Sequence, residues 1–212
     1  MDDLMALVDA GRIAEDVPLG PLTTYKSGGP ARWYAEVATA ADLTTIVAAR
    51  TAAGVDLLVL GRGSNLLVAD RGYPGLVVRL TGDFASVSIA PDGIVTAGGA
   101  VSLPMLARQT ARAGRGGLEW YVGIPGSVGG AVRMNAGGHG SDTGEWLIDA
   151  SIVDSTTGAV AIRDVAELDL SYRHSNLTSD DVVVSARFRS TESDPARSEA
   201  VLRDITRWRR EH

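Results

Sequence analysis

Apolar residues in the N-terminal part of the chain recur with the spacings of amphipathic helices and buried strands. The helical spacing is clearest where Leu43, Ile46 and Val47 share one side, after Thr39 as a cap and before Gly54 as a stop. Short apolar runs bounded by glycine or proline predict strands. In order, the predicted elements are a helix over 1–16, a strand over 31–37, a helix over 41–53, and strands over 55–60 and 75–80.

A second unit is predicted from Phe84 onward, again by apolar runs between turn residues. Ser102 is predicted to cap a helix that has Pro104 in its first turn and Gly114 at its end. Thr157 and Gly158 lie in a turn that predicts a hairpin. The predicted strands are 87–89 and 93–97 around the turn at 91–93, 147–153 and 159–163 around the turn at 156–158, and 182–188.

The last predicted helix begins at Asp194-Pro195 and places Val201, Leu202, Ile205 and Trp208 on one stripe. Together these patterns predict an α+β protein with two subdomains, over residues 1–84 and 85–193. Residues 194–212 form the C-terminal helix.

Composition excludes several classes of function. The 212 residues carry a net charge of −6 and no cysteine. This rules out disulfides and thiolate chemistry, and argues against a nucleic-acid partner. Because the chain has no apolar run of bilayer length and an acidic N-terminus instead of a signal peptide, we expect no membrane association and a cytoplasmic location.

Glycine is the informative excess, with 25 of 212 residues against about 7% in typical proteins. It is concentrated in two clusters. The first, GRGSN at 61–65, follows a predicted buried strand, and the second extends from Gly123 to Gly138. Successive amide N–H groups in such turns can converge on a diphosphate. Tight turns and close packing explain the spacing equally well.

Two common phosphate-binding loops are excluded. No G-x-x-x-x-G-K-[ST] motif is present, and the single lysine, Lys26, lies outside both clusters. No G-x-G-x-x-G opens a helix after a strand, so a Rossmann nucleotide site is not predicted.

Four ordered motifs cover most of the chain: TTYKSGGPA at 23–31, LGRGSNLLV at 60–68, GLE at 117–119 and GIPGSVGGAVRMNAG at 123–137. In these motifs the chain resembles the UDP-N-acetylenolpyruvoylglucosamine reductases, also called UDP-N-acetylmuramate dehydrogenases. Ser27 replaces the usual aliphatic residue of that family. The resemblance implies an FAD-binding fold of the vanillyl-alcohol-oxidase type, in which two subdomains clasp the flavin. The flavin contacts it implies are Gly61, Arg62, Gly63, Ser64, Asn65, Leu66, Gly123, Ile124, Pro125, Gly126, Ser127, Gly129, Gly130, Asn135 and Ala136.

Tyr172-Arg173 is the second site that the resemblance singles out, although an isolated Arg after Tyr is most often a surface ion-pair partner. The implied reaction uses NADPH to reduce FAD, which then reduces the enolpyruvyl group of a UDP-sugar in peptidoglycan synthesis. Arg173 would stabilise charge on the substrate carboxylate, because a guanidinium is permanently cationic and planar. In the family the proton donor is a serine of a C-terminal domain, helped by a glutamate. Neither motif occurs here, so we expect FAD binding without efficient turnover.

Two alternatives remain at this stage: a flavin oxidase of the same superfamily and a non-catalytic flavin- or nucleotide-binding module. The first is weakened because no covalent flavin-attachment motif is evident. No metal site is predicted, because His139, His174 and His212 stand at unrelated spacings. His139 lies in the second cluster and could touch a flavin, whereas Glu119 is expected to order that loop.

Overall fold

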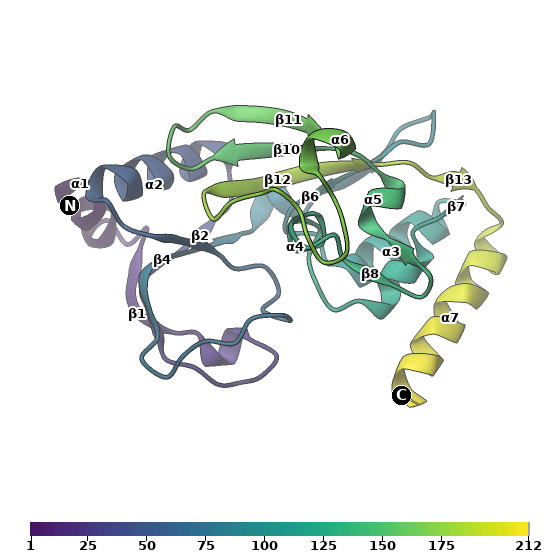
Figure 1. The fold of residues 1–212 in the computed structure, drawn as a ribbon, viewed down its shortest axis with the longest axis horizontal. Coiled ribbons are helices and arrows are strands. Elements are labelled where there is room, and N and C mark those ends of the chain that lie inside the picture. The colour runs from purple at the N-terminus through teal and green to yellow at the C-terminus, as the bar shows by residue number, and fades with distance from the viewer. Residues whose placement is uncertain (212) are drawn as a thin grey trace.

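The protein is built on two main β-sheets that lie side by side, as a computed structural model of the chain shows for residues 1–211 (Figure 1). His212, one of the three histidines, lies outside the described residues. None of the helices in the described part of the chain has the length and apolar character needed to cross a membrane. The same residues contain no group of three or more His, Asp or Glu side chains able to hold a metal ion.

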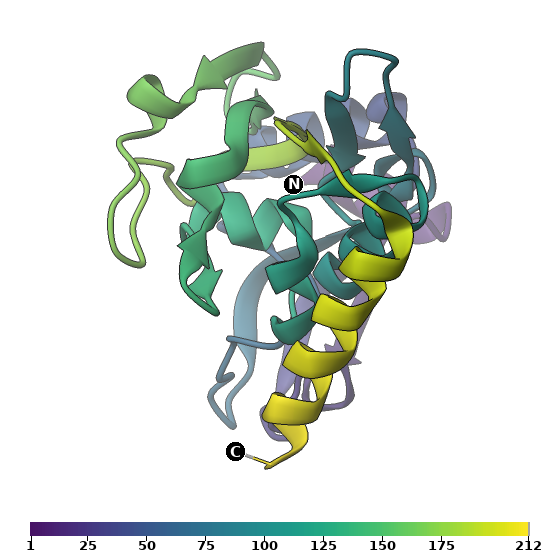
Figure 2. The same cartoon turned by 90° about the vertical axis from the view of Figure 1, so that its right-hand side faces the viewer.

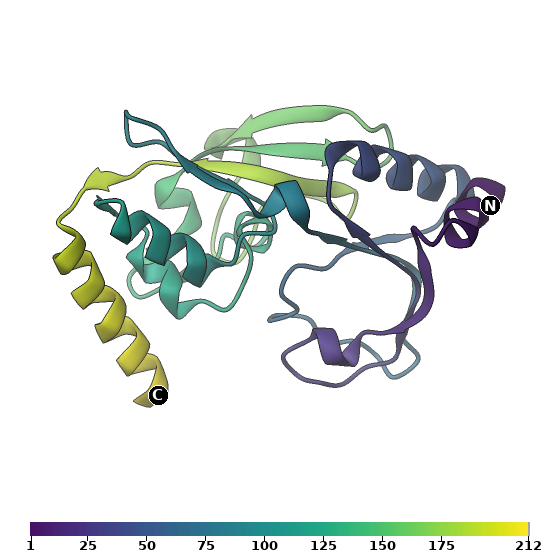
Figure 3. The same ribbon diagram turned by 180° about the vertical axis from the view of Figure 1, so that it is seen from behind.

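The first sheet is formed by the N-terminal residues. Its strand order is β1-β2-β4-β3, with β2 and β3 parallel to β4 and β1 antiparallel at the edge. Helices α1 and α2 pack against each other at the N-terminal end (Figure 3). The element bounds are α1 Asp2–Asp9, β1 Ala14–Pro18, η1 Gly20–Leu22, β2 Pro30–Val37, α2 Ala40–Ala53, β3 Leu57–Val59 and β4 Tyr73–Leu80.

The predicted helix over 1–16 is wrong beyond Asp9. Gly11 adopts a left-handed φ of 69° and ends the helical path. Ala14–Pro18 then pairs antiparallel with β2 as an edge strand. Its side chains are almost all exposed, so no alternation of apolar and polar residues marks it in the sequence.

The second sheet is antiparallel throughout, in the order β11-β10-β12-β6-β5. The predicted hairpin around Thr157 and Gly158 is confirmed as β10–β11. Helices α3 and α4 and the segment η3 lie below this sheet in Figure 1. The strands are β5 Val87–Ile89, β6 Val95–Gly98, β10 Leu147–Asp154, β11 Val160–Asp164 and β12 Asp181–Phe188.

The glycine-rich stretch between residues 114 and 144 is organised into short elements rather than one open loop. Helix α7 then crosses this region on the outside (Figure 2). The remaining bounds are η2 Gly82–Ala85, α3 Leu103–Arg112, β7 Arg115–Gly116, η3 Glu119–Gly123, α4 Val128–Arg133, β8 Gly137–Gly138, β9 Ser141–Asp142, α5 Thr143–Trp146, α6 Val165–Leu168, β13 Thr191–Glu192 and α7 Pro195–Glu211.

Each sheet carries its own main apolar core. The larger core lies between the second sheet and α3, η3 and α4. The other lies between the first sheet and α1 and α2, and it includes Val153 and Val182 from the second sheet. These two valines join the halves of the protein, so the two sheets are held against each other by apolar packing.

Two further sequence predictions need correction. Ser102 precedes α3, but its side chain makes no capping hydrogen bond. On α7, Val201 and Trp208 are 40% and 52% exposed, whereas Leu202 is buried. The helix packs along Ser198, Leu202, Ile205 and Arg209 instead, because Ser198 and Arg209 bond to the neighbouring segment.

The predicted cap and stop of α2 are confirmed and can be tested at Gly54. The Thr39 side chain accepts a hydrogen bond from Asp42 N, and Gly54 is left-handed with φ 64° and open space around it. Gly54→Ala should therefore destabilise the fold by about 1 kcal/mol through backbone strain alone. Gly54→Asn should retain most of the stability, because asparagine tolerates this conformation. Urea unfolding of both variants measures this, and equal stability of the alanine variant and wild type would contradict it.

Candidate functional site

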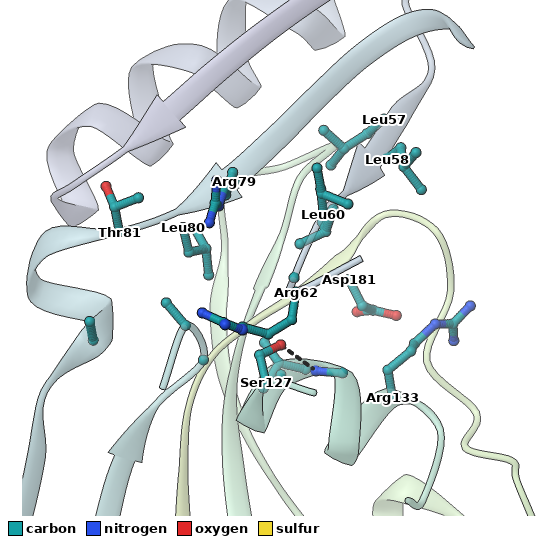
Figure 4. A pocket seen from close by; sticks show the side chains of 18 of the residues that line it. Leu57, Leu58, Leu60, Arg62, Arg79, Leu80, Thr81, Ser127, Arg133 and Asp181 are labelled. Atoms are coloured by element: carbon teal, nitrogen blue, oxygen red, sulfur yellow. Dashed lines mark hydrogen bonds between the residues drawn. The ribbon is translucent and has the colours of Figure 1, made fainter. Parts of the chain in front are cut away.

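A pocket of about 430 Å³ lies at the junction of the two sheets. One side is formed by β3, the loop that follows it and the end of β4. The other is formed by β12, the turn after β6 and helix α4 (Figure 4). Residues from both glycine clusters line it: Gly61, Arg62, Ser127, Gly129 and Gly130. The structure therefore brings together two clusters that are far apart in the sequence.

The first cluster offers backbone donors that the protein does not use. Within residues 1–211, no N–H of residues 61–65 donates a hydrogen bond to a protein acceptor. The loop is nevertheless fixed, because the carbonyl of Gly63 accepts a 3.0 Å hydrogen bond from Thr24 N. Gly63 has a φ of 63°, and a Cβ there would lie 2.1 Å from Leu22 O. Only glycine fits this position, and the turn leaves successive N–H groups without a protein acceptor in residues 1–211.

The second cluster uses its donors differently. At the start of α4, Val128 N and Gly129 N donate to the carbonyls of Val101 and Gly99, each at 2.9 Å. Gly130 N is 3.4 Å from Ser127 Oγ, which caps the helix (Figure 4). These amides are therefore occupied within the protein. Gly129 and Gly130 let a ligand in the pocket come close to the backbone. The amides that lack a protein acceptor among the described residues are those that precede α4.

The two clusters touch each other at the pocket wall. A Cβ on Gly61 would lie 2.5 Å from Ser127 Oγ, and one on Gly126 would lie 3.9 Å from Ser64 Oγ. The amides of Gly126 and Ser127 donate to no protein acceptor within the described residues. The two loops are therefore adjacent, and each has backbone amides without a protein acceptor in the described chain.

The charge around the pocket is positive. The side chains of Arg62, Arg79 and Arg133 belong to its wall, as Figure 4 shows. The carboxylate on the wall, Asp181, is already paired with Arg163 at 3.0 Å. Arg79 is paired with Glu36 at 3.7 Å, whereas Arg62 and Arg133 make no ion pair within the described residues. Two unpaired guanidinium groups on the pocket wall suit a phosphate-bearing ligand.

Several residues of the predicted flavin set lie outside the pocket wall. Asn135 is 6% exposed, and its side chain donates to Ser171 O at 3.0 Å and accepts from Gly144 N at 2.9 Å. Ala136 is buried, and its carbonyl accepts a hydrogen bond from Thr143 Oγ1 at 2.9 Å. Asn135 therefore ties three segments together and has little hydrogen-bonding capacity left for a ligand.

Thr143 also links to the core through Tyr121, whose hydroxyl lies 3.0 Å from Thr143 Oγ1. Burial raises the pKa of the Tyr121 phenol, so the hydroxyl stays protonated and donates this bond. The two hydrogen bonds of Thr143, to Tyr121 and to Ala136, anchor the end of the second cluster to the core of the protein.

Arg173 lies on the exposed loop between α6 and β12, away from the wall of the pocket. It has a φ of 56°, donates to Gly137 O at 3.1 Å, and its guanidinium lies 5.8 Å from the ring of Tyr172. Tyr172 is 91% exposed. One hydrogen bond uses a small part of the donor capacity of a guanidinium, which has five N–H groups.

Sequence reasoning missed the part of the site that comes from other segments. Arg79 is the penultimate residue of β4, Arg133 ends α4, and Asp181 begins β12. Each has the appearance of an ordinary surface charge in the sequence, and only the meeting of the sheets places them around one pocket. Glu119, in contrast, orders its loop as expected, because it accepts a 2.7 Å hydrogen bond from Gly117 N.

Comparison with known proteins gives a consistent result. The model of the FAD-binding domain family matches residues 31–162. The chain is 45% identical to a UDP-N-acetylenolpyruvoylglucosamine reductase of Synechococcus sp. (strain RCC307), over 84% of this chain and 58% of that protein. It is 34% identical to the crystal structure of the corresponding reductase from Thermus caldophilus, with a TM-score of 0.80, over 93% of this chain and 70% of the other.

The fold extends to more distant proteins. A glucooligosaccharide oxidase of Acremonium strictum aligns with a TM-score of 0.62 at 19% identity, over 90% of this chain and 42% of the other. The predicted α+β FAD-binding fold of the vanillyl-alcohol-oxidase type is confirmed by these matches. The chain spans about three-fifths of the length of the curated relatives it matches.

The two asparagines of the predicted flavin set should respond oppositely to substitution. Asn135→Ala removes two partly buried hydrogen bonds of a buried side chain, so we expect a loss of about 2 kcal/mol in the free energy of unfolding. Asn65 is exposed and makes no side-chain hydrogen bond within the described residues, so Asn65→Ala should change stability by less than about 0.5 kcal/mol. Urea unfolding compares them, and equal losses would contradict this assignment.

Proposed function

Because the chain belongs to the UDP-N-acetylenolpyruvoylglucosamine reductase family, we propose that it binds FAD in the pocket between its two sheets. The observation that carries this proposal is the set of unused amide donors at residues 61–65, beside the free donors of Gly126 and Ser127. A diphosphate offers oxygens enough to satisfy several such donors at once. Arg62 would add a charged contact at the same place.

The rest of the pocket wall fits the apolar ring systems of the cofactor. Leu60, Leu80 and Val183 are buried residues of the wall, and Gly129 allows close approach of the backbone. In this arrangement residues 1–84 and 85–193 are the two FAD-binding subdomains, each with its own sheet. Asn135 and Ala136 of the predicted flavin set hold the end of the second loop in place.

The proposed reaction is reduction of a UDP-N-acetylglucosamine enolpyruvate to UDP-N-acetylmuramate in peptidoglycan synthesis. When bound, FAD would supply the hydride chemistry, with NADPH as the donor. In the proposal Arg173 faces the substrate carboxylate and stabilises the negative charge that builds on its oxygens during hydride addition. It would act as a fixed cation and not as a proton donor, since a guanidinium does not deprotonate at neutral pH.

The oxidase alternative rests on a likeness below 25% identity, which concerns the fold alone. Reduction of the bound flavin distinguishes the alternatives under anaerobic conditions. The proposed reductase is reduced by NADPH, an oxidase by a sugar or alcohol, and a non-catalytic module by neither.

FAD binding should depend on Arg62. Arg62→Ala removes a cation from the pocket wall, so the Kd for FAD should rise roughly tenfold or more, as expected for a hydrogen bond to a charged group. Arg71→Ala is the matched control, because Arg71 is also exposed but lies outside the pocket wall. Quenching of flavin fluorescence measures both. Equal Kd values for the two variants, or failure of the wild-type chain to bind FAD, would refute the proposal.

Residues 1–212 should bind FAD without sustaining turnover. The family resemblance attributes proton delivery to a serine and a glutamate of a C-terminal domain, whose motifs do not occur in this chain. Consumption of NADPH in the presence of the UDP-sugar enolpyruvate, followed at 340 nm, is expected to stay at the rate seen without the sugar. Steady substrate-dependent consumption would show that this chain contains its own proton donor.

A further inference from the structure

Helix α7 is bonded near both of its ends to η3, the segment that leads into the second glycine cluster. Near its start, Ser198 Oγ donates a hydrogen bond to Glu119 Oε1 at 2.6 Å. The other carboxylate oxygen of Glu119 accepts a hydrogen bond from Gly117 N. Near its end, the Arg209 guanidinium donates to the carbonyl of Gly123. The segment η3, Glu119–Gly123, runs between these two attachments. It leads directly into Ile124, Pro125, Gly126 and Ser127.

Gly123 is enclosed by its neighbours as well as bonded to α7. A Cβ at this position would lie 2.4 Å from His139 Nε2 and 3.0 Å from Ile205 Cγ2. The His139 ring meets the Trp208 ring edge to face at 5.1 Å. His139, which the sequence suggested as a flavin contact, is therefore placed between Gly123 and α7. The glycine is required here by close packing against the helix.

The segment that contains His139 also contacts Arg173, the predicted catalytic arginine. His139 lies at the tip of the hairpin formed by β8 and β9, and Arg173 donates to Gly137 O in β8. A displacement of α7 would therefore also displace the β8–β9 hairpin and the second cluster. Contacts through packed side chains and hydrogen bonds carry such coupling between neighbouring segments.

We infer that Arg209 is a positioning residue for the flavin loop: by holding the Gly123 carbonyl, it fixes where the free amides of Gly126 and Ser127 lie. The inference rests on the proposed binding of FAD. In this inference α7 holds the second of the two loops in a fixed position. Arg209 is an exposed residue, so its substitution removes this contact without opening a core.

Hydrogen exchange of the free protein tests the positioning without any cofactor. The amides of Tyr121 and Ile124 donate to Leu118 O and Tyr121 O within this segment. Arg209→Ala should accelerate exchange of these two amides several-fold, and Arg209→Lys should restore part of the protection, because an ammonium can also donate to the carbonyl. Arg210→Ala is the control, since Arg210 is adjacent but lines the groove between α3 and α7. Identical exchange in the Arg209→Ala and Arg210→Ala variants would overturn the inference.

Flavin binding provides the second readout. Arg209→Ala should raise the Kd for FAD about tenfold and alter the visible circular dichroism of the bound flavin, with Arg209→Lys intermediate and Arg210→Ala unchanged. Unchanged affinity and spectrum in Arg209→Ala would overturn the inference. If the wild-type chain did not bind FAD, the proposed function would fail, whereas the exchange experiment would still decide whether α7 fixes the loop.

Discussion

Unpaired backbone donors in the loop after β3 are the constraint around which the site is organised. Buried backbone N–H groups in folded proteins nearly always have an acceptor, whereas exposed ones bind water or a ligand. The N–H groups of residues 61–65 have no such acceptor within the described chain, although the loop itself is held firmly by Thr24 and by the contact of Gly63 with Leu22 O. A fixed loop with free donors is complementary to an anion. The parallel pairing of β3 with β4 places this loop at the junction of the sheets.

The two glycine clusters use their glycines for different physical purposes. In the first, Gly63 permits a left-handed turn that leaves amides free. In the second, Gly129 permits helix α4 to approach Gly99 and Val183, and the helix amides are consumed in that contact. Gly123 serves a third purpose, because it accommodates His139 and Ile205.

Local patterns in the sequence predicted the elements whose boundaries are chemically marked. Helix α2 begins at the Thr39 cap and ends at Gly54, and the β10–β11 hairpin turns at Thr157 and Gly158, as expected. Strand β1 was missed because its exposed side chains carry no periodic signal. The resemblance pointed to both loops of the site. Arg79 and Arg133 join the pocket only through the meeting of separate elements, and the contact of Arg209 with a distant carbonyl has no local signature.

The most direct test of the account follows the amides of residues 61–65 by ¹H–¹⁵N NMR, during titration with FAD and, separately, with riboflavin. If these N–H groups bind the diphosphate, FAD should move their resonances downfield and slow their exchange with solvent, because new hydrogen bonds form there. Riboflavin, which has no phosphate, should leave them unchanged. Equal responses to the two ligands, or no response to FAD, would contradict the account.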